Sequence, residues 1–183
     1  MHGVVSLLED TYYRLVEDLW AELEKEFGVR GVYATPYPHF SYQVASGYDS
    51  EVLEPILHDF ASRNSPLQIH AGGLGIFTGT SPVLYIPVVR TQELSRFHAA
   101  LWKEISPAGT GIVDYYTPEN WMPHITIGFA DLNRDKLSQI VHHLSERNFS
   151  WQMTVDNLAL IYDTGSKQDL RSRFNFGKAS LQA

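Results

Sequence analysis

The most constraining feature of this sequence is an internal duplication. The stretch "PHFSYQ" from Pro38 resembles "PHITIG" from Pro123, and "ILHDFASRNSPLQ" from Ile56 resembles "IVHHLSERNFSWQ" from Ile140. The two histidines of the first pair are 85 positions apart, and the second pair of stretches is offset by 84. There are two copies, and their period is longer than that of a solenoid repeat. The duplication therefore predicts two related lobes that face each other.

Each copy has the order strand, helix, strand, strand. Apolar residues at steps of three and four predict helices over residues 6–27, 53–63, 91–105 and 133–146. Apolar runs bounded by turn residues predict strands over 31–35, 38–45, 67–77, 83–89, 121–129, 150–155, 158–162 and 171–176. We expect an α+β fold in which mostly antiparallel sheets with flanking helices form two pseudo-symmetric lobes around a central cleft.

Particular residues set the expected ends of these elements. Ser6 and Glu9 have the spacing of a capping box, so the first helix is expected to begin at Ser6 and to stop at Gly28. Pro55 is expected in the first turn of the second helix, where its missing N–H is tolerated. The stretch "SPAGTG" from Ser106 is expected to be a flexible loop. We expect one bilobal domain over 1–183, with repeat units at about 31–90 and 116–176.

Each copy also carries a histidine and a hydroxyl residue two positions apart in an expected strand. Side chains alternate between the faces of a strand, so His39 and Ser41 share one face, as do His124 and Thr126. If a pseudo-twofold axis relates the lobes, the two strands can face each other across a cleft. Two imidazoles and two hydroxyls would then meet at one point.

This set of side chains suits transfer at a phosphodiester. One imidazole can remove a proton from the attacking hydroxyl or water, while the other protonates the leaving oxygen, because the pKa of histidine lies near neutrality. The two hydroxyls can donate hydrogen bonds to the phosphoryl oxygens in the transition state. We therefore predict His39 and His124 as the catalytic pair and Ser41 and Thr126 as phosphate-binding residues. The near-symmetry of the copies leaves open which histidine is the acid.

The paired motifs resemble those of a known family, the 2H phosphoesterases, which includes enzymes similar to bacterial 2′-5′ RNA ligases and cyclic nucleotide phosphodiesterases. Its signature is two copies of His-x-Ser/Thr-hydrophobic, and "HFSY" at His39 and "HITI" at His124 both match. The resemblance covers nearly the whole chain from Gly31 onward. It implies a LigT-like fold and metal-independent action on 2′,3′-cyclic phosphates or 2′-5′ linkages of RNA ends or nucleotides. After the second motif, however, Gly128-Phe129-Ala130-Asp131 stands where the RNA-ligase-like branch often has a basic residue.

Charge and composition restrict the partners. The net charge is −7, whereas proteins that bind long nucleic acids are usually basic, so we expect an RNA end or a nucleotide. The chain has no cysteine, which excludes thiolate chemistry and agrees with a cytoplasmic location. We expect no cofactor and no metal, because no Asp/Glu cluster has ligand spacing. The apolar runs are too short to span a membrane, and we expect a monomer.

Two other functions stay open at the level of sequence. A binding module for RNA ends or nucleotides could keep the cleft and catalyse poorly. A transition-metal site at the histidines would instead predict loss of activity with a chelator. Weaker candidates are aromatic residues that could stack on a base and arginines that could reach a phosphate, namely Tyr37, Tyr115, Tyr116, Trp121, Arg90, Arg171 and Arg173. The histidines at 58, 70, 98, 142 and 143 are expected to be structural or exposed.

Overall fold

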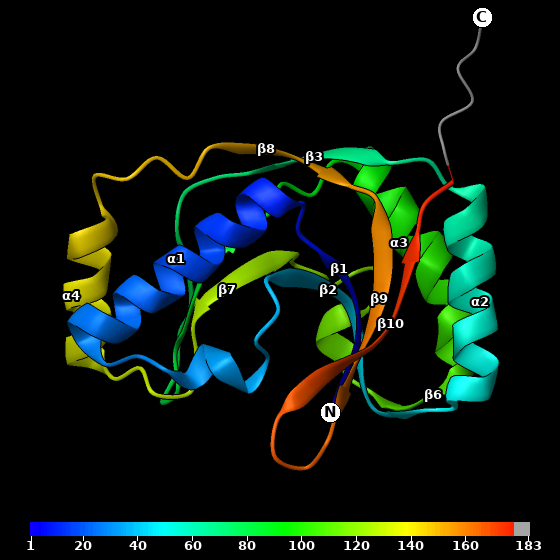
Figure 1. Ribbon diagram of the computed structural model, residues 1–183, viewed down its shortest axis with the longest axis horizontal. Helices are drawn as coiled ribbons and strands as arrows, with labels where there is room; N and C mark the ends of the chain where they lie inside the picture. The colour runs from blue at the N-terminus through cyan, green and yellow to red at the C-terminus, as the bar shows by residue number, and fades with distance from the viewer. Residues whose placement is uncertain (178–183) are drawn as a thin grey trace, which may run out of the picture.

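Two antiparallel sheets form the two lobes of the protein, for which a computed structural model describes residues 1–177 (Figure 1). One sheet has the strand order β10-β9-β1-β2-β6, and the other has the order β4-β5-β7. The strands are β1 (His2–Leu7), β2 (His39–Tyr48), β3 (Leu67–Ala71), β4 (Gly75–Phe77), β5 (Val83–Pro87), β6 (Gly109–Ile112), β7 (His124–Gly128), β8 (Trp151–Val155), β9 (Asn157–Asp163) and β10 (Gln168–Asn175). The expected α+β fold with antiparallel sheets is confirmed.

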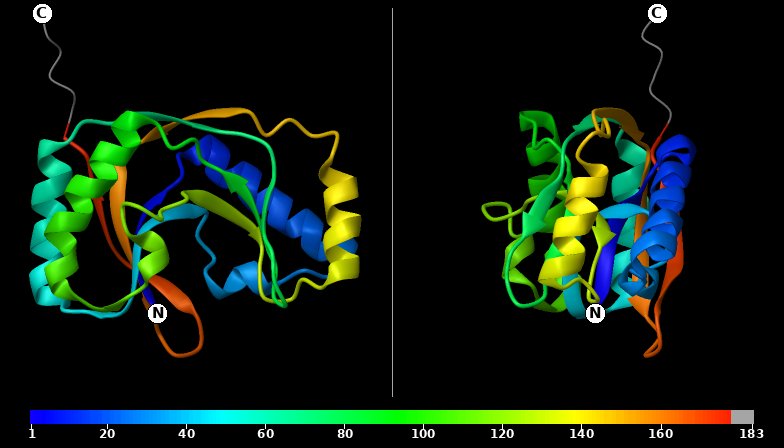
Figure 2. Two further views of the ribbon diagram at one scale, coloured as in Figure 1. Left: turned by 180° about the vertical axis from the view of Figure 1, so that it is seen from behind. Right: turned by 90° about the vertical axis from the view of Figure 1, so that its left-hand side faces the viewer.

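Two helices lie at one end of the molecule and one at the other, and the fourth runs from that second end toward the middle (Figures 1 and 2). They are α1 (Asp10–Phe27), α2 (Ser50–Arg63), α3 (Gln92–Ile105) and α4 (Arg134–Leu144), with the 3-10 turns η1 (Gly31–Ala34), η2 (Ser106–Ala108) and η3 (Asp114–Tyr116). Helix α2 packs against β9 and β10, and α3 packs against β2; α1 packs against β7 and α4. Helix α1 follows β1 of the five-stranded sheet yet packs on β7 of the three-stranded sheet. Helix α3 follows β5 of the three-stranded sheet yet packs on β2 of the five-stranded sheet.

A two-stranded sheet of β3 and β8 joins the copies. Ile69 of β3 pairs with Met153 of β8, and these two residues are 84 positions apart, which is the offset of the repeated stretches. A residue that faces its own equivalent lies at a two-fold axis. The two lobes are therefore pseudo-symmetric.

The strands beside the two motifs are also equivalent. Strand β1 pairs antiparallel with β2, and Leu7 faces His39. Strand β5 pairs antiparallel with β7 in the same way, and Pro87 faces His124. Thus β1 has the same place beside the first motif as β5 has beside the second.

The sequence does not predict β1, and it places the start of the first helix too early. Ser6 lies inside β1, where its hydroxyl is 2.9 Å from the hydroxyl of Tyr42. The helix begins at Asp10 and stops, as expected, at Gly28, whose backbone is left-handed with φ of 65°. Val4 and Val5 are buried in the centre of the five-stranded sheet, and this burial outweighs the local capping signal.

Glycines account for two further differences from the expected strands. The stretch 31–35 forms η1 instead of a strand, because Gly31 lies against the backbone of Phe129, where a Cβ would be 1.8 Å from the carbonyl oxygen. The expected strand 67–77 divides into β3 and β4, which belong to different sheets. Gly73 lies between them with φ of 74°, a conformation that favours glycine.

Two other expectations are wrong in detail. Helix α2 begins at Ser50, because the side chain of Asp49 caps it by accepting a hydrogen bond from the backbone N–H of Glu51 at 3.1 Å. Pro55 therefore lies beyond the first turn. The "SPAGTG" stretch forms η2 and then β6, which pairs with the far end of β2, where Ile112 faces Ala45. The remaining expected helices and strands are confirmed to within a few residues.

The motif strands run through the centre of the hydrophobic core. Phe40 and Tyr42 of β2 and Ile125 and Ile127 of β7 are fully buried. The residues between them in sequence are half-buried and face the other side. None of the helices within residues 1–177 has the length and apolar character needed to cross a membrane.

Candidate functional site

The four predicted site residues line one cleft. His39 and Ser41 reach it from β2, and His124 and Thr126 reach it from β7; the cleft has a volume of about 910 Å³. The two strands contact each other here although they belong to different sheets. In both strands the alternation of side chains buries one face in the core and leaves the histidine and the hydroxyl residue toward the cleft.

Each motif strand has a β-bulge immediately after its hydroxyl residue. Ser41 pairs with Val5 and Gln43 pairs with Val4, so Tyr42 is the extra residue in β2. The pairing of β7 with β5 shifts at the equivalent place, and Ile127 is the extra residue there. Bulges bend a strand and change the direction of its side chains, and they occur often beside active sites. The duplication has preserved this irregularity in both copies.

Both imidazoles are oriented in the same way by a backbone carbonyl. The Nδ1 atom of His39 lies 2.5 Å from the carbonyl oxygen of Tyr37, and the Nδ1 atom of His124 lies 2.7 Å from that of Met122. A carbonyl oxygen only accepts, so Nδ1 carries the hydrogen in each ring. In the neutral form each Nε2 atom is then free to accept a proton.

Burial holds both histidines in their neutral form. Burial is the main cause that lowers the pKa of His39 to about 4; the hydrogen bond to the Tyr37 carbonyl opposes this shift, and the charge of His124 adds a smaller lowering effect. Burial also lowers the pKa of His124, against the opposing effect of its bond to the Met122 carbonyl. An anion between the two rings would favour the protonated form and raise both pKa values again.

Aromatic side chains surround His124. The ring of Phe77 lies edge-on to the imidazole with a centroid distance of 4.9 Å, and the ring of Tyr85 lies at 5.1 Å. Phe77 and Tyr85 stack on each other at 4.2 Å, and Tyr115 packs against Phe77 at 5.5 Å. Phe77, Tyr115, Tyr116 and Phe129 line the cleft, so its wall beside His124 is aromatic.

The surroundings of His39 differ. Aliphatic residues, Val5 and Ile161, border a small hollow beside it together with Gln168. The hairpin between β9 and β10 forms the wall of the main cleft here, with Ser166 and Lys167 among its lining residues. Within residues 1–177, Lys167 is the only Lys or Arg that lines the cleft. The wall beside His39 is therefore more polar than the one beside His124.

Comparison with known proteins agrees with this geometry. Residues 12–167 match the family described as the 2′-5′ RNA ligase superfamily. The chain belongs to this superfamily. A Bacillus cereus protein that bears the name "Putative phosphoesterase" is 25% identical over 171 residues, which are 91% of this chain and 94% of that protein.

Solved structures share the fold of this superfamily member. The structure of the Thermus thermophilus protein TT0787 has a TM-score of 0.66 at 15% identity and covers 98% of this chain and 99% of its own. Escherichia coli LigT complexed with 3′-AMP has a TM-score of 0.60 at 13% identity and covers 96% of both chains. The LigT-like fold and the resemblance to the 2H phosphoesterases are confirmed.

Of the weaker candidates, only Tyr115 and Tyr116 line the cleft within the described residues. Trp121 is buried, with 1% exposed, and Tyr37 donates its hydroxyl hydrogen to Asp169. Arg90 donates to the carbonyl of Trp121 at 3.0 Å. The two remaining arginines pair with carboxylates, Arg171 with Glu54 and Arg173 with Asp156. None of these three arginines is positioned to hold a phosphate in the cleft.

The acidic residue that follows the second motif has a structural contact. The carboxylate of Asp131 accepts hydrogen bonds from the backbone N–H groups of Arg30 at 2.6 Å and Gly31 at 3.1 Å. It fixes the entry of η1 against the end of β7. Asp131 therefore joins the segment after the second motif to the backbone at the start of η1.

The sequence does not single out Phe77, Tyr85 or Lys167. A signal for them does exist, because β4 and β9 occupy equivalent places in the two sheets, and the segments that follow these two strands both border the cleft. Aligning β4 with β9 would have pointed to residues near both motifs. No group of three His, Cys, Asp or Glu side chains within residues 1–177 is arranged to hold a metal ion.

Proposed function

We propose that the protein is a phosphoesterase that opens 2′,3′-cyclic phosphates, or cleaves and re-forms 2′-5′ phosphodiesters, at RNA ends or in nucleotides. The observation that carries this proposal is the meeting of both motifs in one cleft, with each Nδ1 bonded to a carbonyl and each Nε2 free. The histidines supply both proton transfers, so the reaction proceeds without a metal ion.

In the proposed reaction, one Nε2 atom removes a proton from the water that attacks phosphorus. The other imidazole, in its protonated form, donates a proton to the 2′ or 3′ oxygen as its bond to phosphorus breaks. The Ser41 and Thr126 hydroxyls donate hydrogen bonds to the two non-bridging oxygens, on which negative charge increases in the transition state. A 2′-5′ linkage forms when a 5′ hydroxyl takes the place of the water, attacks the cyclic phosphate and displaces the 3′ oxygen. In the reverse direction the 3′ hydroxyl attacks and the 5′ oxygen leaves, so the two imidazoles exchange their roles.

The substrate itself assists in forming the acid. Both imidazoles are held neutral in the free protein, and a phosphodiester anion favours a proton on one of them. Once one ring is protonated, its charge opposes protonation of the other. The bound anion thus leads to one acid and one base, which is the combination that the reaction requires.

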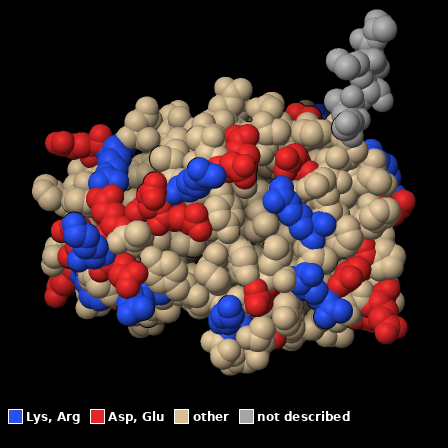
Figure 3. Space-filling view, viewed as in Figure 1, with Lys and Arg blue, Asp and Glu red and all other residues tan. Residues whose placement is uncertain are grey.

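The properties of the cleft favour a short substrate. Within residues 1–177, the lining of the cleft includes a single Lys or Arg, and Figure 3 shows positive and negative side chains interspersed over one face of the molecule. The aromatic wall beside His124 suits stacking with a base, and Lys167 suits an anionic group. A nucleotide or the last nucleotides of an RNA fit these features, and the similar E. coli LigT has been solved with 3′-AMP.

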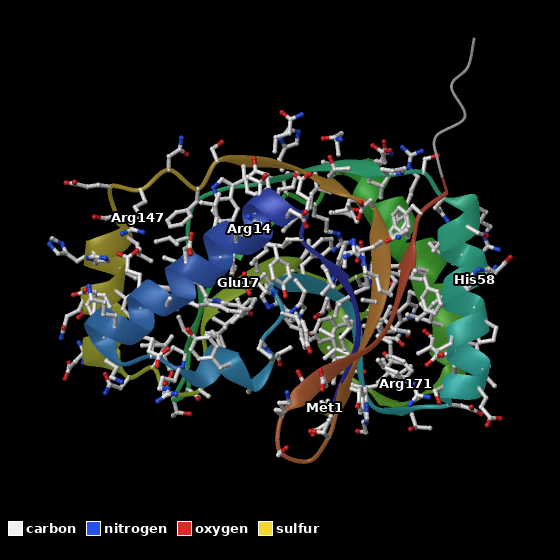
Figure 4. All side chains as sticks on the ribbon, in the orientation of Figure 1. Met1, Arg14, Glu17, His58, Arg147 and Arg171 are labelled. Carbon is white, nitrogen blue, oxygen red and sulfur yellow. The ribbon has the colours of Figure 1, made fainter. Side chains whose placement is uncertain are left out.

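The test is hydrolysis of adenosine 2′,3′-cyclic phosphate in the presence of EDTA. We expect turnover that survives the chelator and falls by about 10² to 10⁴ in His39→Ala and in His124→Ala. A matched control is His58→Ala, because His58 is exposed on α2 and lies far from the centre of the molecule (Figure 4).

Each other outcome contradicts a defined part of the proposal. Binding of the cyclic nucleotide without turnover would instead indicate a binding module. Loss of turnover with EDTA and its return with a divalent ion would indicate metal chemistry. Full activity in either motif-histidine variant would refute the proposed roles of the two imidazoles.

A further inference from the structure

Two buried indoles hold the backbone of the two motif strands. The indole N–H of Trp121 donates to the carbonyl oxygen of Ser41 at 2.8 Å, and the indole N–H of Trp20 donates to that of Thr126 at 3.1 Å. The acceptor in each case belongs to the hydroxyl residue of the motif. Trp20 lies on α1 and Trp121 lies in the segment before β7, so the two donors come from positions that are not related by the repeat.

These bonds are made where the sheets give the strands little support. Strand β7 is an edge strand of its sheet. Strand β2 pairs with β6 only from Ala45 onward, so on that side the motif half of β2 has no neighbouring strand among the described residues. The bulge after each hydroxyl residue further interrupts the ladder. An edge carbonyl beside a bulge needs another donor, and the indoles provide it.

Both indoles are themselves rigidly packed. Trp121 is 1% exposed and stacks on the ring of His98, with a centroid distance of 3.9 Å and an interplanar angle of 14°. The guanidinium of Arg90 lies 6.0 Å from the centre of the Trp121 ring. Trp20 is 4% exposed and packs edge-on against Tyr33 at 6.1 Å. Donors held in this way restrict the positions that the acceptor strands can take.

The two bonds also link the copies of the repeat. Trp20 precedes the first motif in the chain and binds the strand of the second, whereas Trp121 precedes the second motif and binds the strand of the first. Strands β2 and β7 lie in different sheets, so no sheet ladder fixes their separation. We propose that Trp20 and Trp121 are positioning residues that set the distance and angle between the His39–Ser41 and His124–Thr126 half-sites. This inference rests on the proposed function of those half-sites.

The test replaces each indole with phenylalanine, which keeps an aromatic ring but removes the N–H donor. For Trp20→Phe and Trp121→Phe we expect kcat for adenosine 2′,3′-cyclic phosphate to fall about tenfold or more, with KM changed by less than about threefold, since alignment in the transition state depends most on geometry. In the double variant, kcat should fall only a few-fold below that of the more affected single variant, because both bonds set the same distance between β2 and β7. Trp151→Phe is the matched control, because its ring packs against Tyr12 and Phe149 in the β3–β8 region.

A second readout does not need turnover. In nuclear magnetic resonance titrations of the imidazoles, Trp121→Phe should shift the signals of His39 more than those of His124, and Trp20→Phe should do the reverse. Kinetics are measured well below the melting temperature of each variant, so that a loss of folded protein is not counted as a loss of kcat. Wild-type kcat together with unchanged imidazole signals would overturn the inference. An inactive wild-type protein would contradict the proposed function, and the imidazole signals would still test the positioning role.

Discussion

The half-site at His39 and the half-site at His124 share their local geometry, but different residues surround them. In both, the histidine faces the cleft, its Nδ1 is held by the carbonyl two residues earlier, and a bulge follows the hydroxyl residue. Around His124 the neighbours are aromatic, whereas around His39 they are aliphatic residues and the polar β9–β10 hairpin. Duplication has thus kept the histidine, its carbonyl partner and the bulge, and changed the side chains around them.

This difference implies one preferred orientation of the substrate. A base stacked on the wall beside His124 brings its ribose to that side of the phosphate, and the attacking water approaches from the side of His39. His124 is then placed to protonate the leaving ribose oxygen, and His39 is placed to activate the water. Under the proposed function, the asymmetry of the walls therefore supports a choice between two roles that the symmetry of the motifs leaves open.

The largest expected effect tests this assignment directly. His39→Gln and His124→Gln should each lower turnover of a 2′,3′-cyclic nucleotide by about 10² to 10⁴. On a phosphodiester with a 4-nitrophenolate leaving group, which needs no protonation, His124→Gln should recover most of its activity and His39→Gln should not. Steady-state rates on the two substrates give the comparison. Recovery of His39→Gln instead would reverse the roles.

The two hydroxyls should behave alike. Ser41→Ala and Thr126→Val each remove one proposed donor to a phosphoryl oxygen, and we expect kcat to fall about 10²-fold in each. The control is Ser138→Ala, on the exposed face of α4. The rate losses of the two variants are measured by single-turnover kinetics. A large difference between them would mean that the two hydroxyls contribute unequally to phosphate binding.

A smaller effect is expected at the aromatic wall. Phe77→Ala should raise KM for a cyclic nucleotide about tenfold, because a base–aromatic stack contributes about 1–3 kcal/mol. KM for an abasic ribose 2′,3′-cyclic phosphate should not change. Tyr115→Phe keeps its ring and should leave both KM values near those of the wild type. Equal losses on both substrates in Phe77→Ala would show that Phe77 supports His124 and does not bind the base.

The pH dependence follows from the lowered pKa values. Both imidazoles have a pKa below 6.5 in the free protein, and that of His39 is about 4. The acid form therefore becomes scarce as the pH rises, so kcat/KM should be greatest below pH 6.5 and should fall up to about tenfold per pH unit above that. The pH profile of kcat should lie at higher pH than that of kcat/KM, because bound phosphate raises the pKa values of the two imidazoles. A kcat/KM maximum above pH 7 would contradict this account.

The smallest effect is expected at the polar wall. Lys167 is about half exposed, and its ammonium lies 3.9 Å from the carboxylate of Asp169, so its contribution is screened by solvent. Lys167→Ala should raise KM by up to about fivefold at low salt, and the difference should disappear as the salt concentration increases. A KM effect that is independent of salt would show a direct, desolvated contact.

The core of the site could be predicted from sequence because its signals are local and occur twice. The alternation of side chains in a strand places His39 with Ser41 and His124 with Thr126, and the second copy supplies the partner. The wall residues could not be found in this way. Phe77 reaches His124 only because β4 pairs with β5 and β5 pairs with β7, and no local pattern predicts that pairing.

The dependence on contacts between distant segments also explains why the sequence misplaces the start of the first helix and does not reveal the role of the two indoles. Strand β1 exists because β2 and β9 flank it, and a six-residue stretch with only three large apolar residues does not by itself distinguish a strand from the first turn of a helix. Trp121 is an open stacking candidate in the sequence, whereas in the fold it is buried and donates to Ser41. Contacts between distant segments decide both cases.

The exchange of α1 and α3 between the lobes has a consequence for the two halves of the chain. A fragment that ends before β5 contains α1 without β7, and the remaining fragment contains α3 without β2. Each fragment therefore lacks the surface on which one of its helices packs, so we expect the two fragments to fold only together.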